Sequence, residues 1–400
     1  MLKYFEPDQV LVIQDLGTWM KPLDSWLYPP TTSDAESPHS LDTCSSVGTR
    51  VGNLLASVHC DATLVSKSQT LTDDGKLWFE NPENKDIVRD RITGSTLPIQ
   101  RPRVTPDTGK VEKMVGTILQ EIEDGFLHTV PLGSSSSPPS GVPKLMFSIG
   151  DLWTGSILVG APNTTSGSNP NTSFNGGEVE VGLIDWEFAS PARIGQDIAQ
   201  LSAWLYLFAT SSSWSLVGPR YRRAVVDTIG ISLTPGADPG RLGSDFGDGV
   251  DHGPEVEGGA ELVTGETLGK SAAGSMLNAL FEAYARKVKE HPDYAWFVDG
   301  DRDKHKFRKE RLAVIRSIWI SFGREVIYVA IEADCRFSSF FAVDVGGGEG
   351  EEEVKAWQRA MIEVGSWYVL TAGKSPDEEF EEVVRKEGVL RRMYTVSGSL

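Results

Sequence analysis

The chain has 400 residues, of which 40% are hydrophobic, and carries a formal net charge of −18. This length exceeds the usual size of one domain, so we expect one large or two modest domains with a sizeable core. The excess of 56 acidic over 38 basic residues argues against an electrostatic grip on DNA or RNA, and we predict no nucleic-acid partner.

The cysteines and the apolar stretches of the sequence indicate in which cellular compartment we expect the protein. Cys44, Cys60 and Cys335 are odd in number and widely spaced, which predicts no disulfide framework and fits a reducing environment. Residues 1–6 do not resemble a signal peptide. The most apolar long stretch, 198–217, contains glutamine and several serines, so it predicts a buried helix rather than a membrane span. A cytoplasmic location without a membrane partner is therefore expected.

The first elements in chain order are a strand and two helices. Residues 10–13 form a fully apolar run that predicts a buried strand, and residues 29–46 indicate a loop. Apolar residues at helical spacing from Val47 predict an amphipathic helix ending near His59, which we interpret as a helix end. A second stripe, over 111–122, predicts another helix.

Short strands are expected near the middle of the chain. A linker at 133–140 leads to a strand at 145–147, and the apolar run 157–159 predicts a further strand. Leu183 and Ile184 end another strand. This strand and the strand at 157–159 are predicted to form a hairpin with an elongated insertion over 160–178.

The remainder of the chain is predicted to be helical. A Gly-rich acidic segment at 230–275 indicates a surface loop. Helical stripes follow at 276–288, 312–327 and 354–369, and no internal repeat is evident. We therefore predict an α+β chain, mainly α.

Two aspartates stand in apolar contexts that suit phosphoryl transfer. Asp151 lies in SIGDLWTGSILV and Asp185 in VGLIDWEF. Such chemistry needs one carboxylate to orient or deprotonate the attacking hydroxyl and another to hold magnesium on the phosphates. The alternative is that each aspartate is only a turn or cap residue beside a strand.

Three segments together resemble one family. IGDLWTGSILV resembles the HGDLxxxN catalytic loop of the aminoglycoside phosphotransferase and choline kinase superfamily, and GLIDWEFA resembles its metal-binding segment. RIGQDIAQL resembles the family's next helix, which opens with a buried aspartate. Order and spacing agree for all three, and the pattern is nearest to that of methylthioribose kinases.

The resemblance implies roles for individual residues. Asp151 would orient the acceptor hydroxyl, and Asp185 would coordinate Mg²⁺. Ser156 stands where many relatives have a metal-binding asparagine. Glu187, if the chain stays extended, emerges on the same side as Asp185 and could assist the metal or bind substrate, with a surface salt bridge as its alternative.

Structural support for the loop is also implied. Gly150 and Asp197 would hold the catalytic loop, with Asp197 satisfying backbone groups that would otherwise be unpaired. The family's histidine before Gly-Asp is Ile149 here, and isoleucine cannot form that hydrogen bond.

The nucleotide-binding part is the main departure from the family. The strand at 10–13 would be the hinge, and Gln14, Asp15 and Leu16 would bind adenine. A kinase-like fold places a five-stranded sheet, a Gly-rich loop and an ATP-anchoring lysine before the hinge, and Lys3 is the sole lysine upstream. Mg²⁺ and ATP as cofactors are therefore conditional on a nucleotide lobe that this chain lacks. The hinge strand is expected to have no sheet partner.

The resulting domain prediction has three parts: a remnant hinge strand at 1–18, a protein-kinase-like C-terminal lobe with a small catalytic hairpin at 19–338, and a helical extension at 339–400. We expect a small-molecule kinase with a hydroxyl acceptor, truncated and weakly active or inactive as given. The alternatives are a non-catalytic binding module and a metal-dependent hydrolase. The acceptor and oligomeric state are open, although the acidic net charge favours a cationic acceptor.

Overall fold

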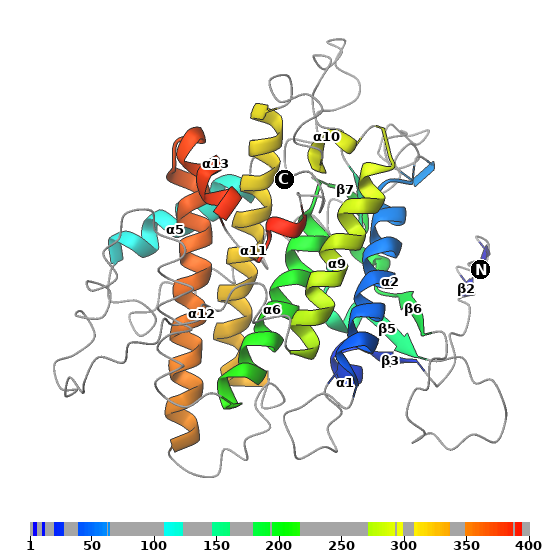
Figure 1. The fold of residues 1–400 in the computed structure, drawn as a ribbon, viewed down its shortest axis with the longest axis horizontal. Helices are drawn as coiled ribbons and strands as arrows, with labels where there is room; N and C mark the ends of the chain where they lie inside the picture. Colours follow the sequence, from blue (N-terminus) through cyan, green and yellow to red (C-terminus); the bar gives the residue numbers. More distant parts are fainter. Residues whose placement is uncertain are drawn as a thin grey trace.

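Five helices lie side by side across the molecule in the computed structural model (Figure 1). Their contacts run in the order α2, α9, α6, α11 and α12, so segments far apart in sequence become neighbours. Their bounds are α2 Leu41–His59, α6 Gln196–Leu216, α9 Ala272–Lys289, α11 Arg308–Arg336 and α12 Glu349–Lys374. The part of the chain that the structure describes is mainly helical, as predicted.

The structure describes residues 3–5, 10–12, 20–27, 39–61, 63–64, 108–122, 146–160, 179–192, 194–216, 271–292, 294–298, 308–336, 349–386 and 389–393. No helix within these ranges combines the length and the apolarity needed to cross a membrane.

Shorter helices surround the row of five. They are α1 Leu23–Leu27, α5 Thr108–Ile122, α10 Ala295–Val298 and α13 Asp377–Lys386, with 3₁₀ turns η4 Thr154–Ser156, η5 Trp186–Phe188 and η6 Arg391–Met393. The helices α12 and α13, which lie in the predicted extension 339–400, contribute buried side chains to the same core as the rest.

The strands form small antiparallel sheets beside α2. Strands β3 (Lys21–Pro22), β5 (Ile157–Gly160) and β6 (Glu180–Leu183) pair in the order β3-β5-β6. Ile157 lies opposite Leu183, so the hairpin expected around the 160–178 insertion is present. Strand β4 (Met146–Ser148) pairs with β7 (Ser190–Ala192), which brings both ends of the hairpin segment together.

The N-terminal strand differs from expectation. Strand β2 (Val10–Val12) pairs with β1 (Lys3–Phe5), with Tyr4 opposite Leu11. The expectation that the hinge strand lacks a sheet partner was therefore wrong, because the three residues before the turn supply one. The segment Gln14–Leu16, predicted to bind adenine, lies outside the described residues.

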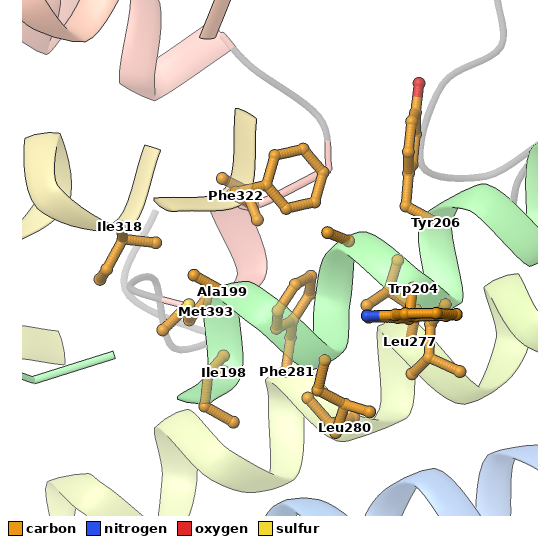
Figure 2. Close-up of a cluster of buried hydrophobic side chains, with 14 of the residues drawn as sticks. Ile198, Ala199, Trp204, Tyr206, Leu277, Leu280, Phe281, Ile318, Phe322 and Met393 are labelled. Atoms are coloured by element: carbon orange, nitrogen blue, oxygen red, sulfur yellow. The ribbon is translucent and has the colours of Figure 1, made fainter. Parts of the chain in front are cut away.

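Helix α6 is the centre of the core. Residues 198 and 199, and then 201 to 211, are buried, as expected of a helix that is apolar all round. Figure 2 shows its side chains between those of α9 and α11, with Trp204 near Leu277 and Leu280. The prediction of a buried helix is confirmed for residues 198–211, and the helix itself extends to Leu216.

Three predicted loops have different boundaries. Helix α2 begins at Leu41, inside the predicted loop 29–46, because Ser40 caps it by accepting a hydrogen bond from the amide of Thr43. Helix α9 begins at Ala272, inside the predicted loop 230–275, because Ser271 caps it by accepting a hydrogen bond from the amide of Gly274. Residues 230–270 and 161–178 lie outside the described residues, whereas Gly160 is the last residue of β5.

Candidate functional site

The loop carrying Asp151 connects β4 to η4 and is tightly folded at Gly150. Gly150 has a φ of +91°, and a Cβ at this position would lie 2.2 Å from the carbonyl oxygen of Phe188. Only glycine accommodates both the backbone conformation and the close approach. The segment after Asp185 therefore sets the path of the chain before Asp151.

Asp197, in the first turn of α6, anchors this loop. Its Oδ1 accepts hydrogen bonds from Ser148 Oγ and the amide of Gly150, at 2.7 and 3.0 Å. Its Oδ2 accepts from the amide of Ile149 at 2.7 Å. These bonds satisfy buried amides that the sharp loop leaves without backbone partners.

His59 completes the surroundings of the Asp197 carboxylate. Its Nε2 lies 3.0 Å from Asp197 Oδ2, and its Nδ1 lies 3.0 Å from the hydroxyl of Tyr284. Burial raises the pKa of Asp197, but the hydrogen bonds from His59, Ser148 and Ile149 outweigh burial and leave the pKa below its ordinary value. The carboxylate is therefore held ionised inside the protein.

The Tyr284 hydroxyl stays protonated and can serve as a donor. Burial raises the pKa of Tyr284 well above its ordinary value, and the negative charge of Asp197 raises it further. The hydroxyl can thus donate to His59 Nδ1 while His59 Nε2–H donates to Asp197. The three side chains link α2, α6 and α9 at the base of the loop.

His59 was interpreted from the sequence as a helix end, and it does end α2. Its buried role was missed, although a signal was present. His59 continues the series Val47, Val51 and Leu55 at a spacing of four, which places it on the buried face of the helix. Through Asp197, His59 is connected to the loop amides of Ile149 and Gly150.

Asp151 itself is held by α6. Its Oδ1 accepts a hydrogen bond of 2.8 Å from Gln200 Nε2, and Gln200 Oε1 accepts one of 3.1 Å from the amide of Leu152. The side chain of Asp151 is partly exposed. The proposed catalytic carboxylate is thus oriented by a neutral amide from the helix that also carries Asp197.

Ser156 joins the two aspartate segments. Its buried Oγ donates to the backbone carbonyl of Asp151 at 3.1 Å, and its own carbonyl accepts from the amide of Ile184 at 3.0 Å. Two hydrogen bonds through this one residue therefore connect Asp151 to the residue before Asp185. As a metal ligand Ser156 could contribute only an oxygen lone pair, because its hydroxyl proton is used in this bond.

Asp185 adopts a left-handed backbone conformation, with φ 70° and ψ 50°. Among the described non-glycine residues it is alone in having a positive φ. Such strain costs free energy and clusters at functional sites. The exposed side chains of Ile184 and Trp186 flank it.

The chain after Asp185 is not extended, which corrects one sequence inference. Trp186–Phe188 form the 3₁₀ turn η5, because the left-handed residue at 185 reverses the chain direction. The argument that an extended chain places Glu187 on the same side as Asp185 therefore fails. The side chain of Glu187 lies outside the described part of the structure.

Within the described ranges, no group of three or more His, Cys, Asp or Glu residues is arranged to hold a metal ion. Protein sites for Mg²⁺ in phosphotransferases commonly use one or two carboxylates, with substrate phosphates and waters supplying the other ligands. Asp185 is partly exposed, so its carboxylate could bind a Mg²⁺ ion whose other ligands come from substrate phosphates and water.

Comparison of the chain with models of known protein families and with curated proteins found no match.

Proposed function

We propose that this protein is a small-molecule phosphotransferase of weak activity that uses Mg-ATP to phosphorylate a hydroxyl group. One observation carries the proposal: Ser156 is hydrogen bonded both to Asp151 and to Ile184, the residue before Asp185. A carboxylate on a rigid loop and a second carboxylate on an adjacent strained turn supply the two functions that phosphoryl transfer requires.

Asp151 would accept a hydrogen bond from the acceptor hydroxyl and align it with the γ-phosphate. Catalysis of this reaction depends mostly on positioning and electrostatics, so the rigidity of the loop matters. Asp197 supplies that rigidity through the amides of Ile149 and Gly150. His59 and Tyr284 hold Asp197 in turn.

Asp185 would hold the magnesium ion. When bound, Mg²⁺ neutralises the charge that develops on the phosphate oxygens. The left-handed backbone at Asp185 fixes the direction in which its carboxylate leaves the chain. Non-glycine residues in this conformation carry a steric cost and cluster at functional sites, which supports a functional role.

Nucleotide binding is the first test, because it does not require turnover. We expect Mg-ATP to raise the thermal midpoint of the wild-type chain and to leave that of Asp185→Asn unchanged. Asparagine tolerates the left-handed conformation, so this variant removes the charge and keeps the backbone. Asp42→Asn, an exposed aspartate in the first turn of α2, is the matched control and should retain the shift.

Transfer to a hydroxyl is the second test. A panel of cationic and neutral hydroxyl compounds, incubated with radiolabelled Mg-ATP, should yield a phosphorylated product that Asp151→Asn loses. Asp185-dependent nucleotide binding without transfer to any acceptor would favour a non-catalytic binding module. Release of phosphate or cleavage of an ester without ATP, lost in Asp151→Asn, would favour a hydrolase and refute the proposal.

A further inference from the structure

Gln200 is a polar residue in the apolar helix α6, and its side chain lies against the loop that carries Asp151. Its Nε2 donates to Asp151 Oδ1 at 2.8 Å, and its Oε1 accepts from the Leu152 amide at 3.1 Å. It lies three residues after Asp197, so both side chains project from the same face of the helix. One face of α6 thus contacts the loop continuously from Ser148 to Leu152.

The orientation of the Gln200 amide is fixed by its partners. A backbone N–H is only a donor, so the atom facing Leu152 must be the carbonyl oxygen. The NH₂ group then necessarily faces Asp151, whose carboxylate accepts it. The side chain therefore fits the site in one orientation and holds one carboxylate oxygen in place.

We propose that Gln200 is a positioning residue for Asp151 in phosphoryl transfer, an inference that rests on the function proposed above. A lysine or arginine at this position would form an ion pair with Asp151 and compete with the substrate hydroxyl. A neutral amide instead orients the carboxylate and leaves it a full negative charge. Ser156 holds the Asp151 backbone carbonyl, so backbone and side chain are fixed from different elements.

Substitutions at Gln200 separate the effect of its hydrogen bond to Asp151 from the effect of its side-chain volume. Gln200→Leu removes both hydrogen bonds, whereas Gln200→Glu keeps the length and the acceptor for Leu152 but places a second carboxylate against Asp151. We expect both to lower kcat by about 10- to 100-fold with KM for Mg-ATP changed less than about twofold. A role in packing alone would leave Gln200→Glu close to wild type.

The matched control is Gln196→Leu, the same change one turn earlier on α6. It should leave kcat and KM unchanged. Suppose that Asp151→Asn abolishes phosphoryl transfer but Gln200→Glu and Gln200→Leu keep full activity. This result would overturn the positioning role of Gln200 and leave the proposed kinase function standing. If Gln200→Leu fails to fold, Gln200→Asn, which is too short to bridge both partners, provides the same comparison.

A spectroscopic test works without turnover. In protein labelled with ¹⁵N at glutamine side chains, Gln200→Leu identifies the Gln200 NH₂ signal. We expect this signal to exchange slowly with solvent and to shift in Asp151→Asn but not in Asp185→Asn. Rapid exchange, or a signal that Asp151→Asn leaves unmoved, would refute the positioning contact. If the Gln200 NH₂ signal exchanges slowly but Mg-ATP does not shift the thermal midpoint, the phosphotransferase function is refuted while the contact between Gln200 and Asp151 stands.

Discussion

Asp197 has no neutral replacement of the same shape, because each carboxylate oxygen accepts hydrogen bonds from two donors. Oδ1 faces Ser148 Oγ and the Gly150 amide, and Oδ2 faces the Ile149 amide and His59 Nε2. Whichever way an asparagine side chain is turned, its NH₂ group meets donors that it cannot satisfy.

We therefore expect Asp197→Asn to lower the free energy of unfolding by about 2–4 kcal/mol, because buried donors lose their acceptor. Urea unfolding followed by circular dichroism measures this. The exposed Asp42 is the control, since Asp42→Asn should cost less than about 1 kcal/mol. Equal losses for the two variants would contradict the anchoring role of Asp197.

The lowered pKa of Asp197 predicts a dependence of stability on pH. Because the folded pKa lies below the ordinary aspartate value of 3.8, the ionised carboxylate stabilises the fold above that value. This stabilisation is lost as the pH falls through the lower folded pKa. The difference in unfolding free energy between wild type and Asp197→Asn should thus be constant near neutral pH and shrink below about pH 4. Urea titrations across this range test it, and a difference independent of pH would count against it.

At most positions an alanine variant is more stable than a glycine variant, and the left-handed conformation of Asp185 predicts the opposite order. At φ 70°, glycine is free of the steric cost that alanine incurs, so Asp185→Gly should be about 1 kcal/mol more stable than Asp185→Ala. At Asp42, in the first turn of α2, the same pair should show the opposite order. Thermal and urea unfolding of the four variants would compare them, and the same order at both sites would argue against strain at Asp185.

Residues at the site differ in how far the sequence predicted them. Asp151, Asp185 and Asp197 could be proposed because each stands in a short segment with a recognisable pattern. His59 bonds to partners 138 and 225 residues away, so no local pattern indicates its contacts. Gln200 reaches Asp151 only because α6 folds back against the loop.

At the scale of elements, α2 and α9 approach closely through glycines. A Cβ on Gly48 would lie 2.2 Å from the carbonyl oxygen of Met276, and one on Gly52 would lie 2.4 Å from that of Leu280. Because α2 ends at His59 and α9 carries Tyr284, this close approach also sets the geometry of the network beneath the loop that carries Asp151.

We expect Gly52→Ala to destabilise the protein by about 1–3 kcal/mol, since the helices must separate to admit the methyl group. Alanine is intrinsically the better helix former, so propensity alone predicts the opposite sign. Gly116 on α5 has no atom within 4 Å of an added Cβ and is the matched control. Gly116→Ala should raise the free energy of unfolding by up to about 1 kcal/mol. Urea unfolding measures both, and a stabilising Gly52→Ala would contradict the close packing.

The long helices and the apolar strands β2, β4, β5 and β6 could be predicted, whereas strands β3 and β7 could not. Stripes of apolar residues at helical spacing over many turns identified α2, α9 and α11. Strands β3 and β7 have two and three residues, too few for any periodic pattern, and they form only because distant strands pair with them. Helix α13 lies in the predicted helical extension 339–400 but was not placed individually, although Phe380, Val383 and Val384 stand at helical spacing and are buried.

At the scale of the whole molecule, buried side chains from α1 to η6 belong to one continuous cluster. Within the described ranges, the helices of the predicted extension 339–400 share it with the helices around the site. Gly323 and Gly365 bring α11 and α12 together as Gly48 and Gly52 do for α2 and α9, since each Cβ would lie 2.5 Å from the other glycine's carbonyl oxygen.

A continuous core predicts that the described helices unfold together. Gly52→Ala and Gly365→Ala disturb opposite ends of the helix row and share no neighbouring side chain, so their effects on the free energy of unfolding should add to within about 0.5 kcal/mol in the double variant. Urea transitions followed by circular dichroism and by tryptophan fluorescence should coincide for each protein. If Gly365→Ala instead produced a separate early transition, α11 and α12 would form an independent unit, and the site would depend only on α2, α6 and α9.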